Sequence, residues 1–315
     1  MQWEPKGRCP VRRAPRCHNF RGWTIALLTI SRVYSRTQPH GQVQIFPANL
    51  HDMNHVTAGE YWNDNAEAWT KLSRAGYDIY RDHLNTPAFL HSLPSIAGLR
   101  GIDLGCGEGH NTRLLAQRGA TMTAIDISPI FIRHAVAEEA RQPLGIIYRE
   151  ASAVELPFAN ASFAFATAFM SFMDIPETGH VLAEALRVLQ PGGFLQFSML
   201  HPCFNPPHRR TCKDEDQVTY AIEVGDYFVD ARGRIDEWTF VTVPLSGRDR
   251  QPKFKVPRFH RPLGEWLNLL VETGFVIERC EEPYPSDEVI RVHPSLQPAQ
   301  VAAHFIHFRV RKPSP

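Results

Sequence analysis

A glycine-rich turn is the part of the sequence best suited to binding a ligand. It reads Gly101-Ile-Asp-Leu-Gly-Cys-Gly-Glu-Gly109 and stands between a short apolar run and a helical pattern. Gly105, Gly107 and Gly109 let the backbone pass close to a ligand, in conformations closed to residues with a Cβ atom. Asp103 can accept hydrogen bonds from a polar or cationic group. Because ligands of open α/β sheets bind outside the carboxyl ends of the strands, the turn predicts a ligand site.

The spacing of the glycines differs from that of the dinucleotide-binding fingerprint G-x-G-x-x-G. After Gly105 and Gly107, that fingerprint requires a third glycine at position 110, which is His110. The next expected strand ends at Asp126, whose carboxylate can accept charge-assisted hydrogen bonds from both hydroxyls of a ribose. Together, the turn and Asp126 predict a site for a ligand with a nucleoside part. A structural turn with a helix-capping aspartate is the simpler alternative.

Two titratable residues could act as a general base at this site. His201 ends an expected strand, and we expect it to point toward the mouth of the pocket, where its imidazole could accept a proton. The alternative is a histidine that caps the strand end or binds a backbone carbonyl group. Asp174 is the second candidate, although it could simply cap the helix that Pro176 begins.

Alternating strand and helix patterns surround these residues and predict an α/β fold with a parallel sheet covered on both faces. The pattern predicts strands over residues 99–104, 121–126, 146–149, 163–170, 194–200, 275–280 and 305–311. It predicts helices from Thr57 onward, interrupted at Asn85-Thr86-Pro87, and then over residues 109–118, 129–140 and 262–273. A further helix opens at Pro176 and is stopped by Pro191-Gly-Gly193.

Residues 201–260 break this alternation. Two β-like runs, 218–229 and 235–243, flank a turn at 231–234, and we expect them to form one inserted hairpin that acts as a lid. Aromatic residues on the hairpin predict an enclosed, largely apolar pocket, unless they only pack the hairpin onto the body. Four basic residues near its end could recognise an acidic acceptor, but a solvated face is the interpretation we favour: Lys253, Lys255, Arg258 and Arg261.

The composition excludes several classes of protein. The 315 residues include 34 basic and 33 acidic ones, a balance that argues against a strongly basic nucleic-acid-binding module and a charge-rich disordered chain. No apolar run reaches the roughly 20 residues that cross a bilayer. The six cysteines form no C-x-x-C pair, so we expect neither a zinc ribbon nor a dithiol redox centre. We expect no metal site, and reduced thiols in the cytoplasm.

Residues 1–52 differ from the rest in charge, with eight basic and only two acidic residues. They could be an export signal, although no cleavage site follows the apolar run at 23–30, or an Arg-rich organelle transit peptide. Our working hypothesis is an unstructured extension, with Met53 as the first residue needed. The catalytic domain would then span residues 53–315, with 201–260 as its inserted lid.

From about Glu60 to Lys312 the chain resembles the class I S-adenosylmethionine-dependent methyltransferases, and most of all their type 11, small-molecule branch. The motifs that carry the resemblance are Ile102-Asp-Leu-Gly-Cys-Gly-Glu-Gly109, Ala124-Ile-Asp-Ile-Ser128, Leu156-Pro-Phe158, Ser162-Phe163 and Arg187-Val-Leu-Gln-Pro-Gly-Gly193. The resemblance implies a Rossmann-like three-layer sandwich with a seven-stranded, mostly parallel sheet and an N-terminal helical cover. It also implies an enzyme that moves a methyl group from S-adenosylmethionine to oxygen, nitrogen or carbon of a small-molecule acceptor by in-line displacement.

The resemblance further implies which residues bind the cofactor. The three glycines of the turn would line its methionine part with Asp103 near the amino group, while Asp126 would hold the ribose and Ile127 would pack on the adenine. The family's usual adenine-binding aspartate is replaced by Ser152, which is followed by Ala153. The complete set of expected cofactor-site residues is Asp103, Gly105, Cys106, Gly107, Gly109, Asp126, Ile127, Ser152, Ala153 and Met170.

Two other functions remain open from the sequence. One is an NAD(P)-dependent oxidoreductase on the same class of fold, and the other is a protein that binds S-adenosylmethionine without catalysis. The sequence leaves the acceptor, the attacked atom and the oligomeric state open.

Overall fold

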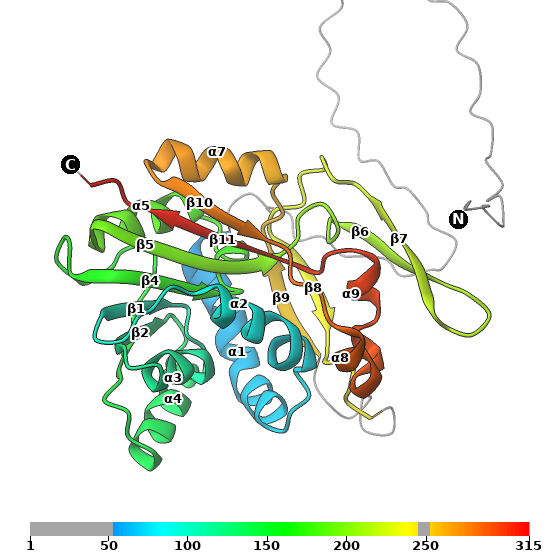
Figure 1. Cartoon of the computed structure of the whole chain (residues 1–315), viewed down its shortest axis with the longest axis horizontal. Coiled ribbons are helices and arrows are strands. Elements are labelled where there is room, and N and C mark those ends of the chain that lie inside the picture. The colour runs from blue at the N-terminus through cyan, green and yellow to red at the C-terminus, as the bar shows by residue number, and fades with distance from the viewer. Residues whose placement is uncertain (1–52, 245–252, 315) are drawn as a thin grey trace, which may run out of the picture. The chain divides into compact units, whose positions relative to one another are not determined.

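The computed structural model describes residues 53–244 and 253–314. Its centre is a seven-stranded sheet in the order β10-β11-β5-β4-β1-β2-β3 (Figure 1). The strands are β1 (Arg100–Leu104), β2 (Thr121–Asp126), β3 (Ile147–Glu150), β4 (Phe163–Phe169), β5 (Leu189–Leu200), β10 (Val276–Glu281) and β11 (Phe305–Arg311). Strands β1 to β5 are parallel, and β11 runs antiparallel to both β5 and β10. The predicted seven-stranded, mostly parallel sheet is confirmed. The predicted extension at 1–52 lies outside the described residues.

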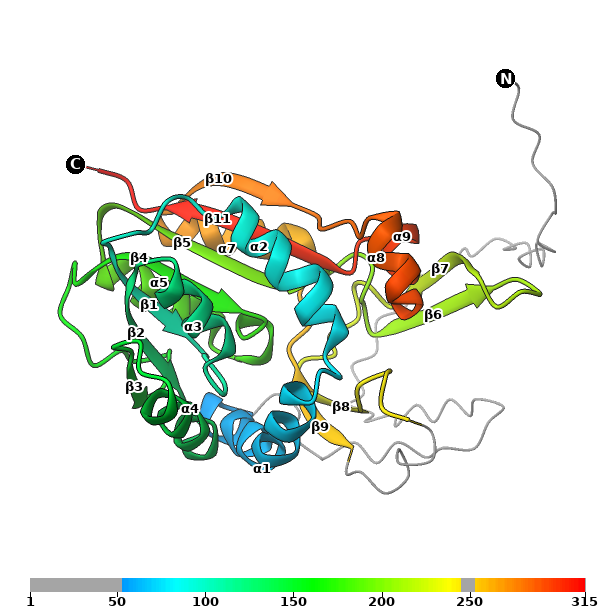
Figure 2. The ribbon, with the colours of Figure 1, turned by 60° about the horizontal axis from the view of Figure 1, so that its bottom comes forward.

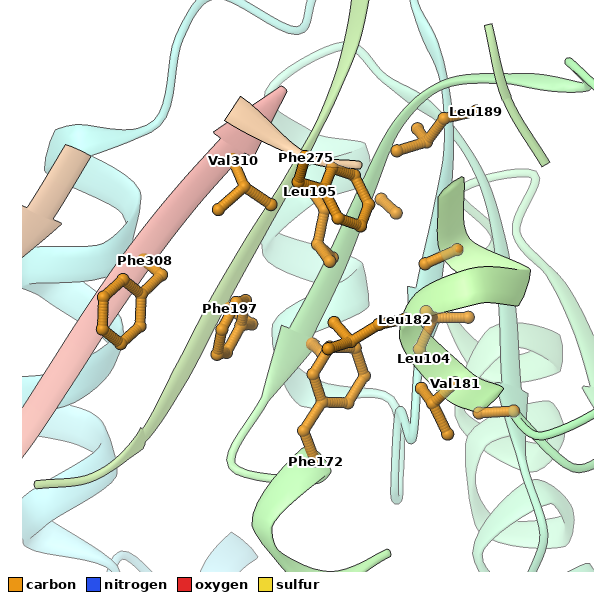
Figure 3. Close-up of a cluster of buried hydrophobic side chains, with 14 of the residues drawn as sticks. Leu104, Phe172, Val181, Leu182, Leu189, Leu195, Phe197, Phe275, Phe308 and Val310 are labelled. Atoms are coloured by element: carbon orange, nitrogen blue, oxygen red, sulfur yellow. The ribbon is translucent and has the colours of Figure 1, made fainter. Parts of the chain in front are cut away.

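Helices cover both faces of the sheet. One face packs against α2 (Thr86–Ser92), α3 (His110–Gln117) and α4 (Pro129–Arg141), and the other packs against α5 (Thr178–Val188) and α7 (Leu263–Thr273). On the second face, Phe172, Leu182 and Phe197 meet in a buried apolar cluster between the sheet and α5 (Figure 3). On the first face, a Cβ atom at Gly101 would overlap the ring of Phe165, which explains the glycine within β1.

Helix α1 (His55–Arg74) lies beside α4 and β9 (Phe254–Arg258) (Figure 2). It begins where the Asn54 side chain accepts a hydrogen bond from the Thr57 N–H at 3.0 Å, an ordinary helix cap. The Asn65 side chain then pairs with both backbone groups of Lys255, at 2.9 and 3.1 Å. These two bonds fasten the helical cover to the inserted segment.

The expected break at Asn85-Thr86-Pro87 is wrong. A π-helical turn, η2 (Arg81–Asn85), leads directly into α2, and Pro87 lies in the first turn of that helix. Proline is tolerated there because the first backbone N–H groups of a helix have no partner within the helix. The stop at Pro191-Gly-Gly193 is also displaced, because α5 ends at Val188 and β5 already begins at Leu189.

The single hairpin expected within residues 201–260 is wrong in its pairing. Strand β7 (Thr219–Gly225) pairs with the preceding β6 (His208–Lys213), and β8 (Arg234–Trp238) pairs with the later β9. The turn between β6 and β7 is closed by the Asp214 N–H, which donates to Val218 O at 3.0 Å. The insertion therefore forms two separate two-stranded ribbons.

The pattern did not predict the helical segment between β10 and β11. It consists of α8 (Asp287–Val292), η4 (Pro294–Leu296) and α9 (Pro298–Val301). The Gln297 side chain binds the backbone N–H and C=O of Thr219, at 3.0 and 2.9 Å, and so connects this segment to β7. Within the described residues, none of the helices combines the length and the apolar character needed to span a membrane.

Candidate functional site

A cavity of about 760 Å³ lies at the carboxyl edge of the parallel strands. The segments that follow β1, β2, β3 and β4 all contribute to its wall. Side chains of α1, of η2 and of the β8–β9 ribbon line it from the other side. The cavity is therefore placed where an open α/β sheet binds its ligand.

The glycine turn presents bare backbone to this cavity at one point. Gly105, Gly107 and Gly109 have φ angles of +75°, +55° and +87°, in the left-handed region that favours glycine. A Cβ atom at Gly105 would lie 2.5 Å from the Cβ of Ser171, and one at Gly109 would lie 2.6 Å from the Tyr148 hydroxyl. A Cβ at Gly107 would meet nothing within 4 Å, because Gly107 faces the open cavity. Gly109 is not among the residues that line the cavity, and its place in the cofactor site stays a prediction.

Asp126 holds the glycine turn against the end of β2. One carboxylate oxygen accepts a hydrogen bond from the Gly107 N–H at 2.8 Å, and the other accepts one from the Ser128 N–H at 2.9 Å. Burial raises the pKa of Asp126 to about 6, although these backbone bonds lower it. The next residue, Ile127, packs so closely on α1 that a Cβ at Gly59 would lie 2.9 Å from its side chain. Both Asp126 and Ile127 line the cavity, as expected.

Asp103 lies deeper, at the end of β1, and also lines the cavity. Its two oxygens accept hydrogen bonds from the hydroxyls of Thr112, at 2.6 Å, and Thr167, at 2.8 Å. Burial raises the pKa of Asp103 to about 6 against the effect of these two bonds. The carboxyl group is thus fixed in orientation by α3 and β4.

Replacing Asp103 with asparagine should make stability less sensitive to pH. The folded protein binds the Asp103 proton more tightly (pKa about 6) than the ordinary value of 3.8 allows, so wild-type stability falls as pH rises through this window. The threonine hydroxyls can rotate to pair with an amide. We expect urea denaturation to give the unfolding free energy of D103N and of wild type at pH 4 and at pH 7. Between these two pH values, the difference between the proteins should change by about 1–3 kcal/mol in favour of D103N. If the difference in unfolding free energy between D103N and wild type is the same at both pH values, the pKa of the Asp103 carboxyl group is not raised.

The remaining expected cofactor-site residues also reach the cavity: Cys106, Ser152, Ala153 and Met170. Met170 has a φ angle of +56°, which a residue with a side chain rarely adopts. Its N–H donates to Ser198 O at 3.0 Å, which holds this turn at the end of β4. Strained backbone of this kind is concentrated at functional sites.

Asp174 is buried, with 3% of its surface exposed, and faces the cavity from η3 (Phe172–Asp174). Burial raises its pKa to about 7, while Arg258, whose guanidinium lies 4.0 Å from Oδ1, lowers it. Among the described residues Oδ1 has no hydrogen-bond partner. The alternative of a helix cap is wrong, because α5 begins at Thr178 and its capping position is Glu177.

His201 does not line the cavity, so the expectation that it points into the pocket mouth is wrong. Its Nδ1 accepts a hydrogen bond from the Cys203 N–H at 3.2 Å, and its Nε2 lies 2.7 Å from a carboxylate oxygen of Glu282. Because Nδ1 accepts, Nε2 carries the proton and donates it to Glu282. The residue is 2% exposed and caps the end of β5, which it ties to the chain after β10, as the alternative interpretation expected.

Of the four basic residues expected to form a solvated face, two are exposed and two are not. Lys253 and Lys255 are exposed, but Arg258 pairs with Asp236 at 3.2 Å and lines the cavity. Arg261 is buried, with its guanidinium 5.8 Å from the centre of the Trp266 ring. These two cations are structural parts of the interior.

Several cavity residues were missed by sequence reasoning. Glu108, inside the glycine turn, forms ion pairs of 3.3 Å with both Arg74 and Arg81. Trp69 of α1 was missed as well. Its ring centre lies 5.5 Å from that of Trp238, one of the aromatic residues of the inserted segment that were expected at the pocket. An acidic residue within the glycine turn is the sequence signal that could have pointed to Glu108. No local pattern links α1, which carries Trp69, to the ribbon that carries Trp238.

Residues 102–197 match the family model described as a methyltransferase domain, of type 11. The chain is 32% identical over 159 residues to the 27-O-demethylrifamycin SV methyltransferase of Amycolatopsis mediterranei, with 48% of this chain and 51% of the relative covered. It is 32% identical over 151 residues to a ubiquinone biosynthesis O-methyltransferase of Methylococcus capsulatus, with 48% and 64% covered. The chain thus spans between half and two thirds of these two relatives.

A crystal structure of an S-adenosylmethionine-dependent methyltransferase from Mesorhizobium loti has the same fold. It is 28% identical, with a TM-score of 0.58, and the match covers 71% of this chain and 96% of that one. Residues 102–197, which match the family model, contain Gly105, Gly107, Gly109 and Asp126. These features agree with the motif order in the sequence. Over residues 102–197 the chain is similar to the type 11 methyltransferase domain, and its fold is that of the S-adenosylmethionine-dependent methyltransferase from Mesorhizobium loti.

Proposed function

We propose that the protein transfers the methyl group of S-adenosylmethionine to an oxygen atom of a small-molecule acceptor. The observation that carries the proposal is the open space beside Gly107, next to the carboxylate of Asp126. A ligand there can contact bare backbone on one side and an acidic group on the other. The rest of the cavity wall supplies apolar surface.

The residues present fit this cofactor. Asp126 would accept hydrogen bonds from the ribose hydroxyls, and Ile127 with Ala153 would enclose the adenine. The backbone of Gly105 and Gly107 would follow the methionine part, with the Asp103 carboxyl group near its amino group. A carboxylate is the natural partner for ribose hydroxyls and for an ammonium group.

When bound, S-adenosylmethionine supplies an electrophilic methyl group on a sulfonium, which an acceptor displaces in line. The protein's main task is to hold the two reactants in alignment, which can contribute about 7–11 kcal/mol. The strained turn at Met170 and the bonds to Asp126 fix the walls of the cavity before a ligand arrives. The α1 cover and the β8–β9 ribbon would keep water from the reacting atoms.

Oxygen as the attacked atom is supported by the names of the two curated relatives, which include O-methyltransferases. A small acceptor is supported by the size of the cavity and by its aromatic wall. The cytoplasm is the location that we propose, since the four cysteines of the described residues are all free.

Calorimetric titration of the full chain tests the proposal at its first step. We expect S-adenosylhomocysteine to bind one site per chain, and NADPH to give no heat beyond dilution. A folded protein that binds NADPH and not S-adenosylhomocysteine would instead support an oxidoreductase. Binding of S-adenosylhomocysteine without transfer of labelled methyl to any metabolite would support a non-catalytic role.

A further inference from the structure

Three buried side-chain atoms of cavity-lining residues lack hydrogen-bond partners among the described residues. They are Asp174 Oδ1, Trp238 Nε1 and Thr239 Oγ1, and all three residues line the same cavity. An unsatisfied buried polar group costs about 1–3 kcal/mol, so folded proteins rarely keep one without a reason. A carboxylate, an indole N–H and a hydroxyl without partners thus belong to residues of one cavity wall, which indicates that a ligand with polar groups completes this wall.

The position of Asp174 places this group beside the glycine turn. The side chain of Ser171 lies where a Cβ of Gly105 would be, and its hydroxyl donates to Leu104 O at 2.8 Å. Asp174 follows three residues later, on the single turn of η3. Asp174, whose N–H donates to Ser171 O at 3.0 Å, thus lines the cavity one helical turn from the residue that contacts the glycine turn, along which the methionine end of the cofactor would lie.

The β8–β9 ribbon closes this region from the other side. The Phe259 N–H, just after β9, donates to Met173 O at 3.3 Å and so joins the ribbon to η3. Trp238 lies at the end of β8, and its ring packs edge-on against Trp69 of α1. The cavity wall thus combines aromatic rings with a few polar groups that lack partners, an arrangement suited to a flat, apolar compound with few polar groups.

Building on the proposed function, we propose that Asp174 is a catalytic residue, the base for a hydroxylated aromatic acceptor that Trp238 and Thr239 help to bind. The hydroxyl proton passes to a carboxylate oxygen of Asp174 as the acceptor oxygen bonds to the methyl carbon. The bond from that carbon to the sulfonium sulfur breaks, and its electron pair stays on sulfur. The products are a methyl ether, a neutral thioether and protonated Asp174.

The charges around Asp174 set the pH at which it can act. Arg258 faces it from β9 and Asp236 from β8, while Glu177 lies at the start of α5 and pairs with His55. Burial is the largest effect and raises the pKa of Asp174 to about 7. A base must be ionised to act, so the rate should rise with pH below about 7 and level off above it.

The test compares Asp174→Asn with Asp226→Asn. Asp226 is exposed, lies outside the cavity and has a φ angle of +58°, which asparagine tolerates. Full-length proteins are given labelled S-adenosylmethionine with a metabolite extract, with catechol and with ortho-phenylenediamine. We expect D174N to lose about 100- to 10,000-fold in rate, with its affinity for S-adenosylhomocysteine within about twofold of wild type. D226N should match wild type in both measurements.

Each other outcome would overturn the proposal. D174N that binds S-adenosylhomocysteine and keeps a rate within about threefold of wild type would exclude a base at this position. Label transferred to ortho-phenylenediamine but to no hydroxyl compound would exclude the acceptor class, as would no transfer at all by protein that binds the cofactor. If D174N does not fold, the wild-type profile decides, because a rate independent of pH between 5.5 and 8 would contradict a base of this kind. If the wild-type protein does not bind S-adenosylhomocysteine, the proposed function itself is refuted.

Discussion

Replacing Gly107 with alanine should weaken the binding of S-adenosylhomocysteine by about 100-fold or more, with only a small loss of stability. At a φ angle of +55°, an added Cβ costs about 1–2 kcal/mol in the folded state. It would touch nothing within 4 Å, so the free protein should accept it without further rearrangement. The new methyl group would, however, occupy the space in which we place the cofactor. Calorimetry gives the dissociation constant, and urea denaturation gives the stability.

Gly76→Ala is the matched control for this variant. Gly76 has a φ angle of +82°, also has nothing within 4 Å of an added Cβ, and does not line the cavity. Both variants should therefore lose similar stability, while only G107A should lose affinity. Gly105→Ala should be destabilised more than either, because its Cβ would come within 2.5 Å of Ser171 Cβ. Equal affinities of G107A and G76A would mean that no cofactor runs along the turn.

The parts of the fold that could be predicted are those determined by short, continuous stretches of sequence. Strand β2 has the predicted bounds, because an apolar run is followed by a helix that starts at Ser128-Pro129, and the Ser128 side chain does cap that helix. The part of the site expected to bind the cofactor was predictable for the same reason. The glycine turn and Asp126 each end a strand, and parallel pairing of β1 with β2 brings those ends together.

The parts that failed depend on partners far away in the chain. His201 is turned from the cavity by Glu282, which is 81 residues later, and no local pattern encodes that contact. Strand β7 is likewise bonded at Thr219 by the side chain of Gln297, 78 residues later, a contact that no local pattern encodes. Asp174 is buried because β9 packs over η3, so its environment could not be derived from its neighbours in sequence.

Asp126→Asn should cause the largest loss of cofactor affinity, about 100- to 1,000-fold for S-adenosylhomocysteine. Hydrogen bonds to a charged group contribute about 1.5–3 kcal/mol each, and a ribose offers two hydroxyls. The substitution also damages the free protein. Both carboxylate oxygens accept from backbone N–H groups, of Gly107 and Ser128, but an amide has only one accepting oxygen. One backbone N–H would then face an NH₂ group, which should lower the unfolding free energy by about 1–3 kcal/mol.

The pH dependence of binding separates the charge of Asp126 from its role in holding the turn. Its pKa is about 6 in the folded protein, so the carboxylate that would bind the ribose is lost as pH falls below that value. Wild-type affinity for S-adenosylhomocysteine should therefore fall by up to about tenfold per pH unit between pH 6 and pH 5, and D126N should not show this component. Asp216→Asn, at an exposed turn outside the cavity, should keep the wild-type profile. If D126N is destabilised but binds S-adenosylhomocysteine as wild type does at every pH, then Asp126 supports the turn without contacting the cofactor.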